Sequence, residues 1–242
     1  MRNVSIILAV LNEEQNVERL VGQIDKLIDT RRLREVLEIV FVDGGSVDST
    51  AAVVKRLSKT EKRYRIRFME QKTRGGTVAA QLEGVAAARG GIIVIMDADL
   101  QHSPDVIQRL LDKKKGGFDV VVASRSLGYE SSERSIARYM VSRTAQLLAY
   151  RFVKNSQSIK DPLSGFFVTD RKYLKGMKPL PNFYKLLMYL LAINKRLKIS
   201  EVDFSFANRR YGQSKVISLS MKFIKRYIKE LLYYSELESA KK

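Results

Sequence analysis

The sequence predicts an α/β fold in which a mostly parallel β-sheet lies between helices on both faces. Three observations lead to this prediction. Short runs of apolar and β-branched residues, typical of strands buried on both sides, recur through the first half of the chain. Segments with apolar residues at helical spacing separate these runs. The chain of 242 residues is also long enough for one such domain and a small additional element.

The expected elements alternate along the chain. Strands are expected at residues 4–10, 37–42, 65–69, 92–96 and 119–123, and helices at residues 13–28, 49–58, 74–89 and 104–111. Asn12 is the expected cap of the first helix and Asp48 or Ser49 that of the second, because short polar side chains accept hydrogen bonds from the first N–H groups of a helix. Residues 65–69 alternate between polar and apolar, which favours a strand towards the sheet edge. Two more helices are expected, at residues 182–193 and from residue 217 onward.

Composition narrows the class of protein. The chain has no apolar run of about 18 residues, so no membrane-spanning helix is expected. The absence of cysteine excludes disulfides and thiolate metal sites and fits a reducing compartment. A strand begins directly after Asn3, so we expect no signal peptide and a cytoplasmic location, either free or peripheral on the cytoplasmic membrane face. The net charge of +18 favours a polyanionic partner: nucleic acid, anionic lipid or a phosphorylated substrate.

Residues 92–104 contain the strongest functional signal. A wholly apolar run ends at Met96 and is followed by Asp97 and Asp99, with Gln101 two residues further on. Ligands of open α/β sheets bind at the carboxyl ends of strands. Oxygen ligands on such a short arc suit Mg²⁺ or Mn²⁺ that carries the phosphates of a substrate. The alternative is structural, with Asp97 capping the next helix and Asp99 solvated.

Other polar residues also follow predicted strands. Asn12 and Glu13 come after the first strand and Asp43 after the second, so we expect all of them at the sheet edge that carries Asp97 and Asp99. The glycines do not form a dinucleotide fingerprint or a P-loop. Phosphates at this edge must therefore be neutralised by a metal ion and basic side chains. Asp43 can meet a base or ribose, or it can form an Asx-turn into the glycines that follow.

Several segments together form a recognisable pattern. They are VSIILAVLNEE, IVFVDGGSVDST, VIMDADLQHSP, the Ser124–Arg125 pair, KDPLSGFFVTDR and RRYGQSKV. The pattern resembles the family 2 inverting glycosyltransferases, most closely the dolichyl-phosphate (polyprenyl-phosphate) mannosyltransferases, and it runs from Val4 to about Val216. The resemblance implies an A-type glycosyltransferase fold with a C-terminal helical extension. Residues 1–216 are then the expected glycosyltransferase domain, and residues 217–242 a basic amphipathic helix.

The resemblance also implies roles for individual residues. Asp99 and Gln101 are implied as ligands of Mg²⁺ or Mn²⁺. Arg125 and Arg138 would reach the donor or acceptor phosphates, so Asp99, Arg125 and Arg138 are the expected catalytic residues. The residues implied in binding the nucleotide-sugar donor and its phosphates are Ala9, Leu11, Glu13, Val42, Asp43, Asp97, Ala98, Asp99, Gln101, Arg125, Arg209 and Lys215.

The implied reaction is metal-dependent, inverting transfer of mannose from GDP-mannose to a polyprenyl phosphate. A divalent ion, with Arg209 and Lys215 closing over the diphosphate, would stabilise the charge on the leaving group. The attacking phosphate monoester has a second pKa of about 6, so it needs no general base. The family usually has Pro-Thr-Tyr-Asn-Glu where this chain has residues 9–13 as AVLNE, which leaves the donor base open.

Two residues near the expected site have alternative roles. Asp161 can orient an acceptor-binding arginine, form a turn with the following proline, or act as a base. His102 is the only histidine in the chain, and in a turn that opens a helix we expect it to be a structural, hydrogen-bonding residue. Without a second histidine a zinc hydrolase is not expected.

Alternative functions and partners follow from the same observations. The first alternative is the same fold with a UDP-sugar donor such as UDP-glucose, or with a hydroxyl acceptor. The second is a basic nucleic-acid-binding module, but the sequence has no signature for one and no nucleic acid is expected as a partner. The third, a non-catalytic subunit, is disfavoured by the intact metal motif. The helix from residue 217 has an apolar stripe flanked by lysines, so it can bind an anionic membrane surface, its own domain or a second subunit; the oligomeric state is not predicted.

Overall fold

The computed structural model describes residues 3–30, 33, 35–60, 62–73, 75–125, 136–204 and 221–240, and for residues 136–141 and 221–223 it describes the backbone alone. Within these ranges, seven strands form one sheet in the order β3-β2-β1-β4-β6-β5-β7. In chain order the strands are β1 (Val4–Val10), β2 (Val36–Asp43), β3 (Arg65–Glu70), β4 (Ile92–Asp97), β5 (Val120–Arg125), β6 (Phe167–Asp170) and β7 (Ile199–Phe204). Strand β6 runs antiparallel to β4 and β5, and the other pairs are parallel.

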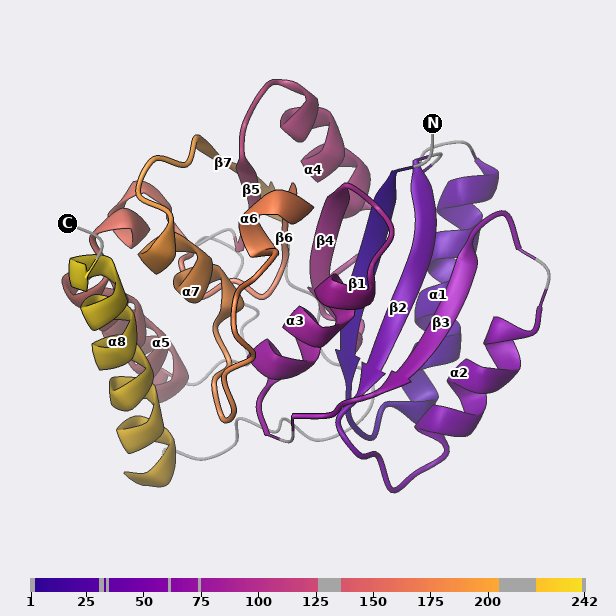
Figure 1. The fold of residues 1–242 in the computed structure, drawn as a ribbon, viewed down its shortest axis with the longest axis horizontal. Helices are drawn as coiled ribbons and strands as arrows, with labels where there is room; N and C mark the ends of the chain where they lie inside the picture. The colour runs from indigo at the N-terminus through magenta and orange to yellow at the C-terminus, as the bar shows by residue number, and fades with distance from the viewer. Residues whose placement is uncertain are drawn as a thin grey trace.

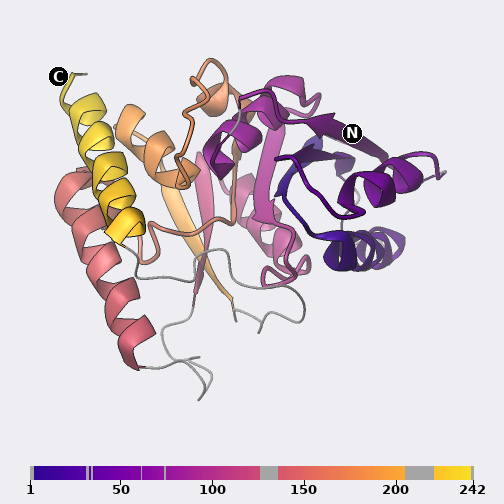
Figure 2. The same ribbon diagram turned by 90° about the horizontal axis from the view of Figure 1, so that it is seen from below.

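Helices cover both faces of this sheet, as Figures 1 and 2 show. One face packs against α1 (Glu14–Asp29), α2 (Thr50–Ser58) and α4 (Val106–Lys115). On the opposite side lie α3 (Thr77–Ala87), α5 (Ile136–Phe152), the short helices η1 (Lys154–Ser158) and α6 (Arg171–Leu174), α7 (Leu186–Ile193) and α8 (Met221–Ala240). Helix α8 packs against α7 and α5. The sheet is therefore the middle layer of three, which explains why its central strands are apolar on both sides.

Strand β4 illustrates how the sequence produces this arrangement. Val94 and Met96 point into the core beneath α1 and α4, whereas Ile93 and Ile95 point into the core beneath α3 and α7. All four side chains are fully buried. Side chains of a strand alternate between its two faces, so a strand between two helical layers must be apolar at every position.

Most of the predicted elements in the first half of the chain are confirmed. Strand β1 has the predicted bounds, β2 and β4 extend one residue further at their carboxyl ends, and β3 lies at the edge of the sheet as expected. The helix expected over residues 74–89 is shorter, because Gly75 and Gly76 both have positive φ and the helix begins at Thr77. The mostly parallel sheet between helices is thus the observed fold.

The second half contains elements that the sequence did not predict. Helix α5, the antiparallel strand β6 and the strand β7 all lie beyond residue 125. The helix expected at residues 182–193 begins only at Leu186. The helix expected from residue 217 corresponds to α8 (Met221–Ala240), and residues 217–220 lie outside the described residues.

Candidate active site

The carboxyl ends of three neighbouring strands meet at one edge of the sheet. Ala9 of β1 is in register with Val42 of β2 on one side and with Asp97 of β4 on the other, and Val10 is in register with Asp43. The predicted convergence of the residues that follow these strands is therefore confirmed for β1, β2 and β4. Val42, which was expected to bind the donor, is fully buried, so neither its side chain nor its backbone is exposed at this edge.

The loops after β1 and β2 are joined by hydrogen bonds at this edge. The Asn12 N–H donates to Ser46 Oγ at 2.9 Å, and Asn12 Oδ1 accepts from the Val47 N–H at 2.9 Å. The Glu13 N–H donates to Thr50 Oγ1 at 2.8 Å. Asn12 therefore bridges two loops instead of capping α1 as expected, and its φ of 53° is a conformation that asparagine tolerates better than most residues.

Two predicted site residues, Glu13 and Asp43, turn inward within these loops. Glu13 is 7% exposed and accepts from Asn16 Nδ2 at 2.7 Å, and Asp43 is 5% exposed and accepts from Ser46 Oγ at 2.5 Å. The Ser46 N–H also donates to the Asp43 carboxylate. The turn-forming role that the sequence allowed for Asp43 is thus present, and it fixes the carboxylate at the carboxyl end of β2.

The turn after β4 presents Asp97, Asp99 and Gln101 together. The Asp97 side chain is 45% exposed. Asp99 Oδ1 accepts from the Gln101 N–H at 3.1 Å, across Leu100, whose φ is 63°. This tight turn brings the Asp99 carboxylate and the Gln101 side chain to the same end of β4. Ala98, between the two aspartates, is 3% exposed, so it offers backbone groups rather than a side chain.

His102 is a structural residue of this turn, as expected. Its Nδ1 accepts from the Asp97 N–H at 3.1 Å, and its ring lies 5.0 Å from the ring of Phe166 and 5.8 Å from that of Phe204, between centroids. Burial lowers the pKa of His102 to about 4. A neutral imidazole is the form that accepts this hydrogen bond.

Arg125, at the end of β5, forms a bidentate ion pair with Asp161. Arg125 Nε donates to Asp161 Oδ2 at 2.7 Å and Nη2 donates to Oδ1 at 3.0 Å. Although burial raises the pKa of Asp161, the hydrogen bonds and charge of Arg125 outweigh burial and hold that pKa below its usual value. Two of the features that the sequence allowed for Asp161 are therefore present: it pairs with an arginine, and its carbonyl accepts from the Ser164 N–H at 3.2 Å in a turn.

Lys185 is a further site residue that sequence reasoning missed. Its Nζ donates to the Leu163 carbonyl at 3.0 Å. Burial and then the charge of Arg125 lower the pKa of Lys185, whereas Glu230, Asp97 and Asp161 raise it. The ammonium group therefore lies within electrostatic reach of Asp97 at the end of β4 and of Asp161, the partner of Arg125. A lysine directly before an apolar helix gives no distinctive signal, since lysines are common at such positions.

The loop between Asp161 and Gly165 connects these groups. A side chain at Gly165 would place its Cβ 3.1 Å from Asp97 Oδ2, so this backbone lies closely against the carboxylate. The same loop provides Asp161 for Arg125 and the Leu163 carbonyl for Lys185. The KDPLSGFF segment thus contacts Arg125, Lys185 and the Asp97 carboxylate.

The remaining predicted residues divide into two groups. Leu11 lies in the loop after β1 and is 38% exposed. Arg138 lies in α5, where its side chain is outside the described part of the structure, and Arg209 and Lys215 lie wholly outside the described residues. In the part of the chain that is described, no three His, Cys, Asp or Glu side chains are grouped closely enough to hold a metal ion between them.

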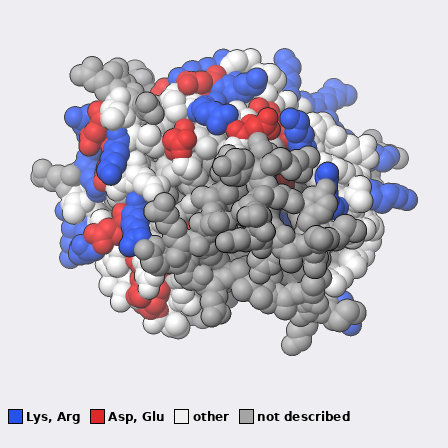
Figure 3. Space-filling view, turned by 180° about the vertical axis from the view of Figure 1, so that it is seen from behind, with Lys and Arg blue, Asp and Glu red and all other residues white. Residues whose placement is uncertain are grey.

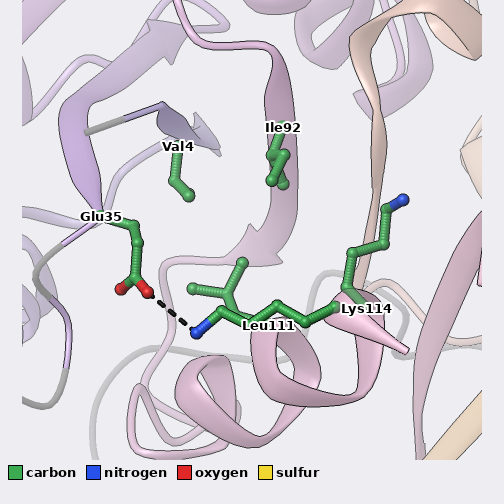
Figure 4. Close-up of a pocket in the computed structure, with 6 residues that line it drawn as sticks. Val4, Glu35, Ile92, Leu111 and Lys114 are labelled. Atoms are coloured by element: carbon green, nitrogen blue, oxygen red, sulfur yellow. Dashed lines mark hydrogen bonds and ion pairs between the residues drawn. The ribbon is translucent and has the colours of Figure 1, made fainter. Parts of the chain in front are cut away.

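A separate shallow pocket lies at the opposite edge of the sheet (Figure 4). Its volume is about 130 Å³. Val4 and Ile92, the first residues of β1 and β4, line it together with Glu35, Leu111, Lys114 and Lys115. Lys115 forms an ion pair with Glu35 at 3.0 Å across this pocket. The pocket lies at the amino ends of the strands, so it is not part of the cluster around Asp97 and Asp99.

The fold is that of the open α/β proteins, and its acidic residues lie at the carboxyl ends of the strands, where such sheets bind their ligands. The sequence model of Glycosyl transferase family 2 matches residues 5–177. The chain is 33% identical over 214 residues to a dolichol-phosphate mannosyltransferase of Pyrococcus furiosus, and this match covers 88% of the chain and 59% of the relative. It is 29% identical to a dolichol-phosphate mannosyltransferase of Saccharomyces cerevisiae, over 94% of the chain and 85% of that protein. The chain belongs to glycosyl transferase family 2.

Other comparisons extend this result. An undecaprenyl-phosphate 4-deoxy-4-formamido-L-arabinose transferase of Pectobacterium atrosepticum is 25% identical, over 91% of the chain and 64% of that protein. A crystal structure of glucosyl-3-phosphoglycerate synthase from Mycobacterium tuberculosis, in complex with Mn²⁺, UDP and glucosyl-3-phosphoglycerate, superposes with a TM-score of 0.72 at 22% identity. This superposition covers 97% of the chain and 80% of that structure. The predicted A-type glycosyltransferase fold is therefore confirmed.

Proposed function

We propose that this chain transfers a hexosyl group from a nucleoside diphosphate sugar to a polyprenyl phosphate, with GDP-mannose as the preferred donor. The observation that carries the proposal is the carboxyl edge of the sheet. There Asp97, Asp99 and Gln101 lie at the end of β4, and the Asp97 carboxylate lies against Gly165. The loop that contains Gly165 also holds Arg125 through Asp161 and Lys185 through the Leu163 carbonyl. Dolichol-phosphate mannosyltransferases among the relatives support the acceptor class and the sugar.

The donor set at Asp99 and Gln101 fits a divalent cation. A carboxylate and a side-chain amide offer oxygen ligands, and Mg²⁺ or Mn²⁺ in such sites is commonly bound by one or two protein groups together with substrate phosphates. When bound there, the ion would neutralise the diphosphate and stabilise its developing charge. The solved relative that contains Mn²⁺ and UDP supports this cofactor class.

Side chains of the protein bind the other parts of the donor and the acceptor. Asp43 and Glu13 lie where the carboxyl ends of β1 and β2 meet, and we propose that they contact the base and ribose of the donor. A phosphate oxygen of the acceptor attacks the anomeric carbon from the face opposite the leaving group, the bond to the diphosphate oxygen breaks, and the nucleoside diphosphate leaves with that electron pair. This single displacement inverts the configuration. Arg125 would hold the acceptor phosphate bidentately, and Arg138, Arg209 and Lys215 are proposed to contact the phosphates.

Asp161 has a defined part in this proposal. Its lowered pKa and its ion pair with Arg125 make it a poor proton acceptor, so we assign it to orienting the guanidinium. This assignment agrees with a phosphate acceptor, which is already ionised near neutral pH and needs no general base. A sugar hydroxyl as acceptor would need such a base.

A donor panel tests the proposal. The protein would be assayed with Mn²⁺, a short polyprenyl phosphate and either GDP-mannose, UDP-glucose or another nucleotide sugar, with heat-inactivated protein as the control. The expected product is polyprenyl-phosphate mannose from GDP-mannose. Turnover of UDP-glucose alone would replace the donor assignment, and this second candidate is retained because the solved relative binds UDP.

The distribution of charge bears on the nucleic-acid alternative. On the face in Figure 3, the coloured Lys and Arg side chains lie in separate places with Asp and Glu among them. Nucleic-acid interfaces gather basic side chains into one patch or stripe. Among the residues coloured on this face, the basic side chains do not form one such patch. Binding to DNA or RNA that weakens with salt and survives Asp99→Ala would support the alternative instead.

We also propose that residues 217–242 place this domain at an anionic membrane surface, peripherally on the cytoplasmic side. Among the described residues no helix is long and apolar enough to cross a bilayer. One side of α8 packs in the core through Leu231 and Tyr234. Beside that buried side Ile224, Ile228 and Leu232 recur at intervals of four and are 37%, 38% and 47% exposed. The neighbouring Lys225 and Lys229 are exposed too, as a membrane-surface helix requires.

Flotation with liposomes that contain anionic lipid tests this second part. Wild-type protein should float with the liposomes at low salt, and Leu232→Glu should weaken that association. Val47→Glu, at an apolar residue that is 92% exposed in the β2–α2 loop, is the matched control and should float as wild type does. A wild-type protein that stays unbound would remove the membrane proposal without affecting the proposed reaction.

A further inference from the structure

The segment of residues 182–185, directly before α7, is bound on one side by the C-terminal helix. Glu230 of α8 is 2% exposed. Its Oε1 accepts from the Tyr184 N–H at 3.0 Å and from the Lys185 N–H at 2.8 Å. The Tyr234 hydroxyl donates to the same oxygen at 2.8 Å. One carboxylate oxygen thus fixes two successive backbone positions of this segment from a helix more than forty residues further along the chain.

On its other side the segment is bound by the turn before α3. The Asn182 N–H donates to the Gly75 carbonyl and the Val78 N–H donates to the Phe183 carbonyl, each at 3.0 Å. A Cβ at Gly76 would lie 2.4 Å from the Phe183 carbonyl oxygen, which no real side chain permits. Gly76 is therefore glycine because two backbones meet there, and its φ of 78° also favours glycine.

The side chain that leaves this segment towards the active site is that of Lys185. Its Nζ donates to the Leu163 carbonyl, in the loop that also holds Asp161. Among the described residues this carbonyl is the only hydrogen-bond acceptor of that ammonium group, which has two further N–H donors for a phosphate oxygen. The carboxylates and the guanidinium that act on its charge are those of Glu230, Asp97, Asp161 and Arg125.

We propose that Glu230 is a positioning residue for Lys185, so that α8 sets the place of a cation that binds the nucleoside diphosphate of the donor. This inference rests on the proposed function and adds to it a residue and a helix outside the sheet edge. The physical reason is that a fixed charge binds a phosphate oxygen well only at hydrogen-bond distance, and an error of about 1 Å is costly. Glu230 keeps Lys185 there because it holds the backbone from which the lysine side chain starts.

The alternative is that Glu230 only stabilises α7 and α8 as a buried hydrogen-bond acceptor. The two roles differ in the ligand affinities of single and double variants. A positioning residue acts through Lys185, so its effect on ligand affinity should vanish once the ammonium is gone. A purely stabilising residue changes the melting temperature but has no interaction with Lys185 in ligand binding.

A double-mutant cycle with full-length protein tests the proposal. We would titrate GDP in the presence of Mn²⁺ into wild type, Glu230→Leu, Lys185→Met and the double variant, and record the melting temperature of each. Lys185→Met should weaken GDP binding about 10- to 100-fold, the range for a lost hydrogen bond to a charged group. Glu230→Leu should weaken it to a similar extent, and the double variant should bind as Lys185→Met does.

Milder variants keep the test valid if Glu230→Leu folds poorly. Glu230→Gln retains Oε1 as an acceptor for the same three donors and should bind GDP almost as wild type does. Gly76→Ala displaces residues 182–185 from the opposite side, without touching α8, and should weaken binding only when Lys185 is present. Full additivity of the Glu230 and Lys185 effects, or GDP affinity unchanged in a folded Glu230→Leu protein, would overturn the positioning role.

The outcome also separates this inference from the proposed function. Wild-type protein that binds no nucleoside diphosphate, in a panel of GDP and UDP with Mn²⁺, would remove both. Wild-type protein that binds GDP or UDP, with additive effects in the cycle for the bound nucleotide, would leave the proposed function intact and remove the role of Glu230 alone.

Discussion

The two ends of the central sheet both contain a buried acidic residue paired with an arginine, and the comparison between them separates structure from function. At the amino end Glu38 is fully buried. It accepts from Ser5 Oγ at 2.7 Å, from Arg67 Nη1 at 3.1 Å and from the Arg89 N–H at 2.5 Å. At the carboxyl end Asp161 is 5% exposed and pairs with Arg125.

Electrostatics alone does not tell these two ends apart. Burial raises the pKa of both Glu38 and Asp161, and hydrogen bonds and arginine charge lower it further than burial raises it. The difference lies in what surrounds each pair. Glu38 is enclosed by β1, β2 and the segment before β4, whereas Arg125 and Asp161 border the exposed carboxylate of Asp97 and the ammonium of Lys185. A perturbed carboxylate therefore indicates function only where its surroundings can admit a ligand.

The largest effect is expected at the carboxyl end. Asp99→Asn should lower glycosyl transfer by at least about a hundredfold, because it removes a charged oxygen ligand from the diphosphate site. The melting temperature should change little, since the residue lies in a turn at the sheet edge. Asp112→Asn, at an exposed aspartate of α4, is the control and should retain full activity. Wild-type activity in a folded Asp99→Asn protein would break the functional half of the comparison.

Asp161→Ala should affect both activity and stability. Removal of one partner leaves the Arg125 guanidinium partly buried without its carboxylate, which costs about 3 kcal/mol of unfolding free energy. Activity should fall at least about tenfold because the arginine is no longer oriented. Urea denaturation and steady-state kinetics measure the two effects. An unchanged kcat/KM would show that the orientation of Arg125 has no part in the reaction.

Glu38→Gln should affect stability alone. The amide brings donors into a site that already contains donors from Ser5, Arg67 and Arg89, so the unfolding free energy should decrease by about 1–3 kcal/mol. Folded protein should retain its kcat and its KM for the donor. A loss of activity at a temperature where the variant is fully folded would contradict the division between the two ends.

The smallest effect is the dependence of stability on pH. Because the pKa values of Glu38 and Asp161 lie below their usual values in the folded protein, the unfolded chain binds more protons in mild acid. Their contribution is complete above the unfolded pKa of about 4 and is lost as the pH falls through the folded-state values. Unfolding free energy measured by urea from pH 7 to pH 3 should decrease, and less steeply in Glu38→Gln. Equal slopes in the two proteins would show that Glu38 is not linked to folding.

Some strands of the sheet could be predicted from sequence and others could not. Strands β1, β2 and β4 are continuous apolar runs, so their bounds and the convergence of Asp43, Asp97 and Asp99 follow from local pattern. Strand β6 has only four residues and begins inside a segment that reads as a turn. Its antiparallel place between β4 and β5 depends on pairing partners distant in the chain, and no local pattern specifies them.

Side-chain roles at the site were harder to predict for a similar reason. Asp161 is a turn residue by sequence, and its role depends on Arg125, which is 36 residues away. Lys185 and Glu230 are ordinary charged residues of helix ends and helix faces until the fold brings them together. Asn12 was expected to cap α1 but bridges to the β2–α2 loop. In that loop Ser46 Oγ accepts from the Asn12 N–H, and the Val47 N–H donates to Asn12 Oδ1.

The most direct test of the central claim is a calorimetric titration of GDP and UDP into wild-type protein and Asp99→Asn, each with Mn²⁺ and again with EDTA. We expect wild-type protein to bind one nucleoside diphosphate with Mn²⁺, to lose most of that affinity in EDTA, and to show no such difference once Asp99 is replaced. Nucleotide binding that is equally strong with EDTA, or unchanged in Asp99→Asn, would contradict a metal-assisted diphosphate site at the carboxyl end of β4.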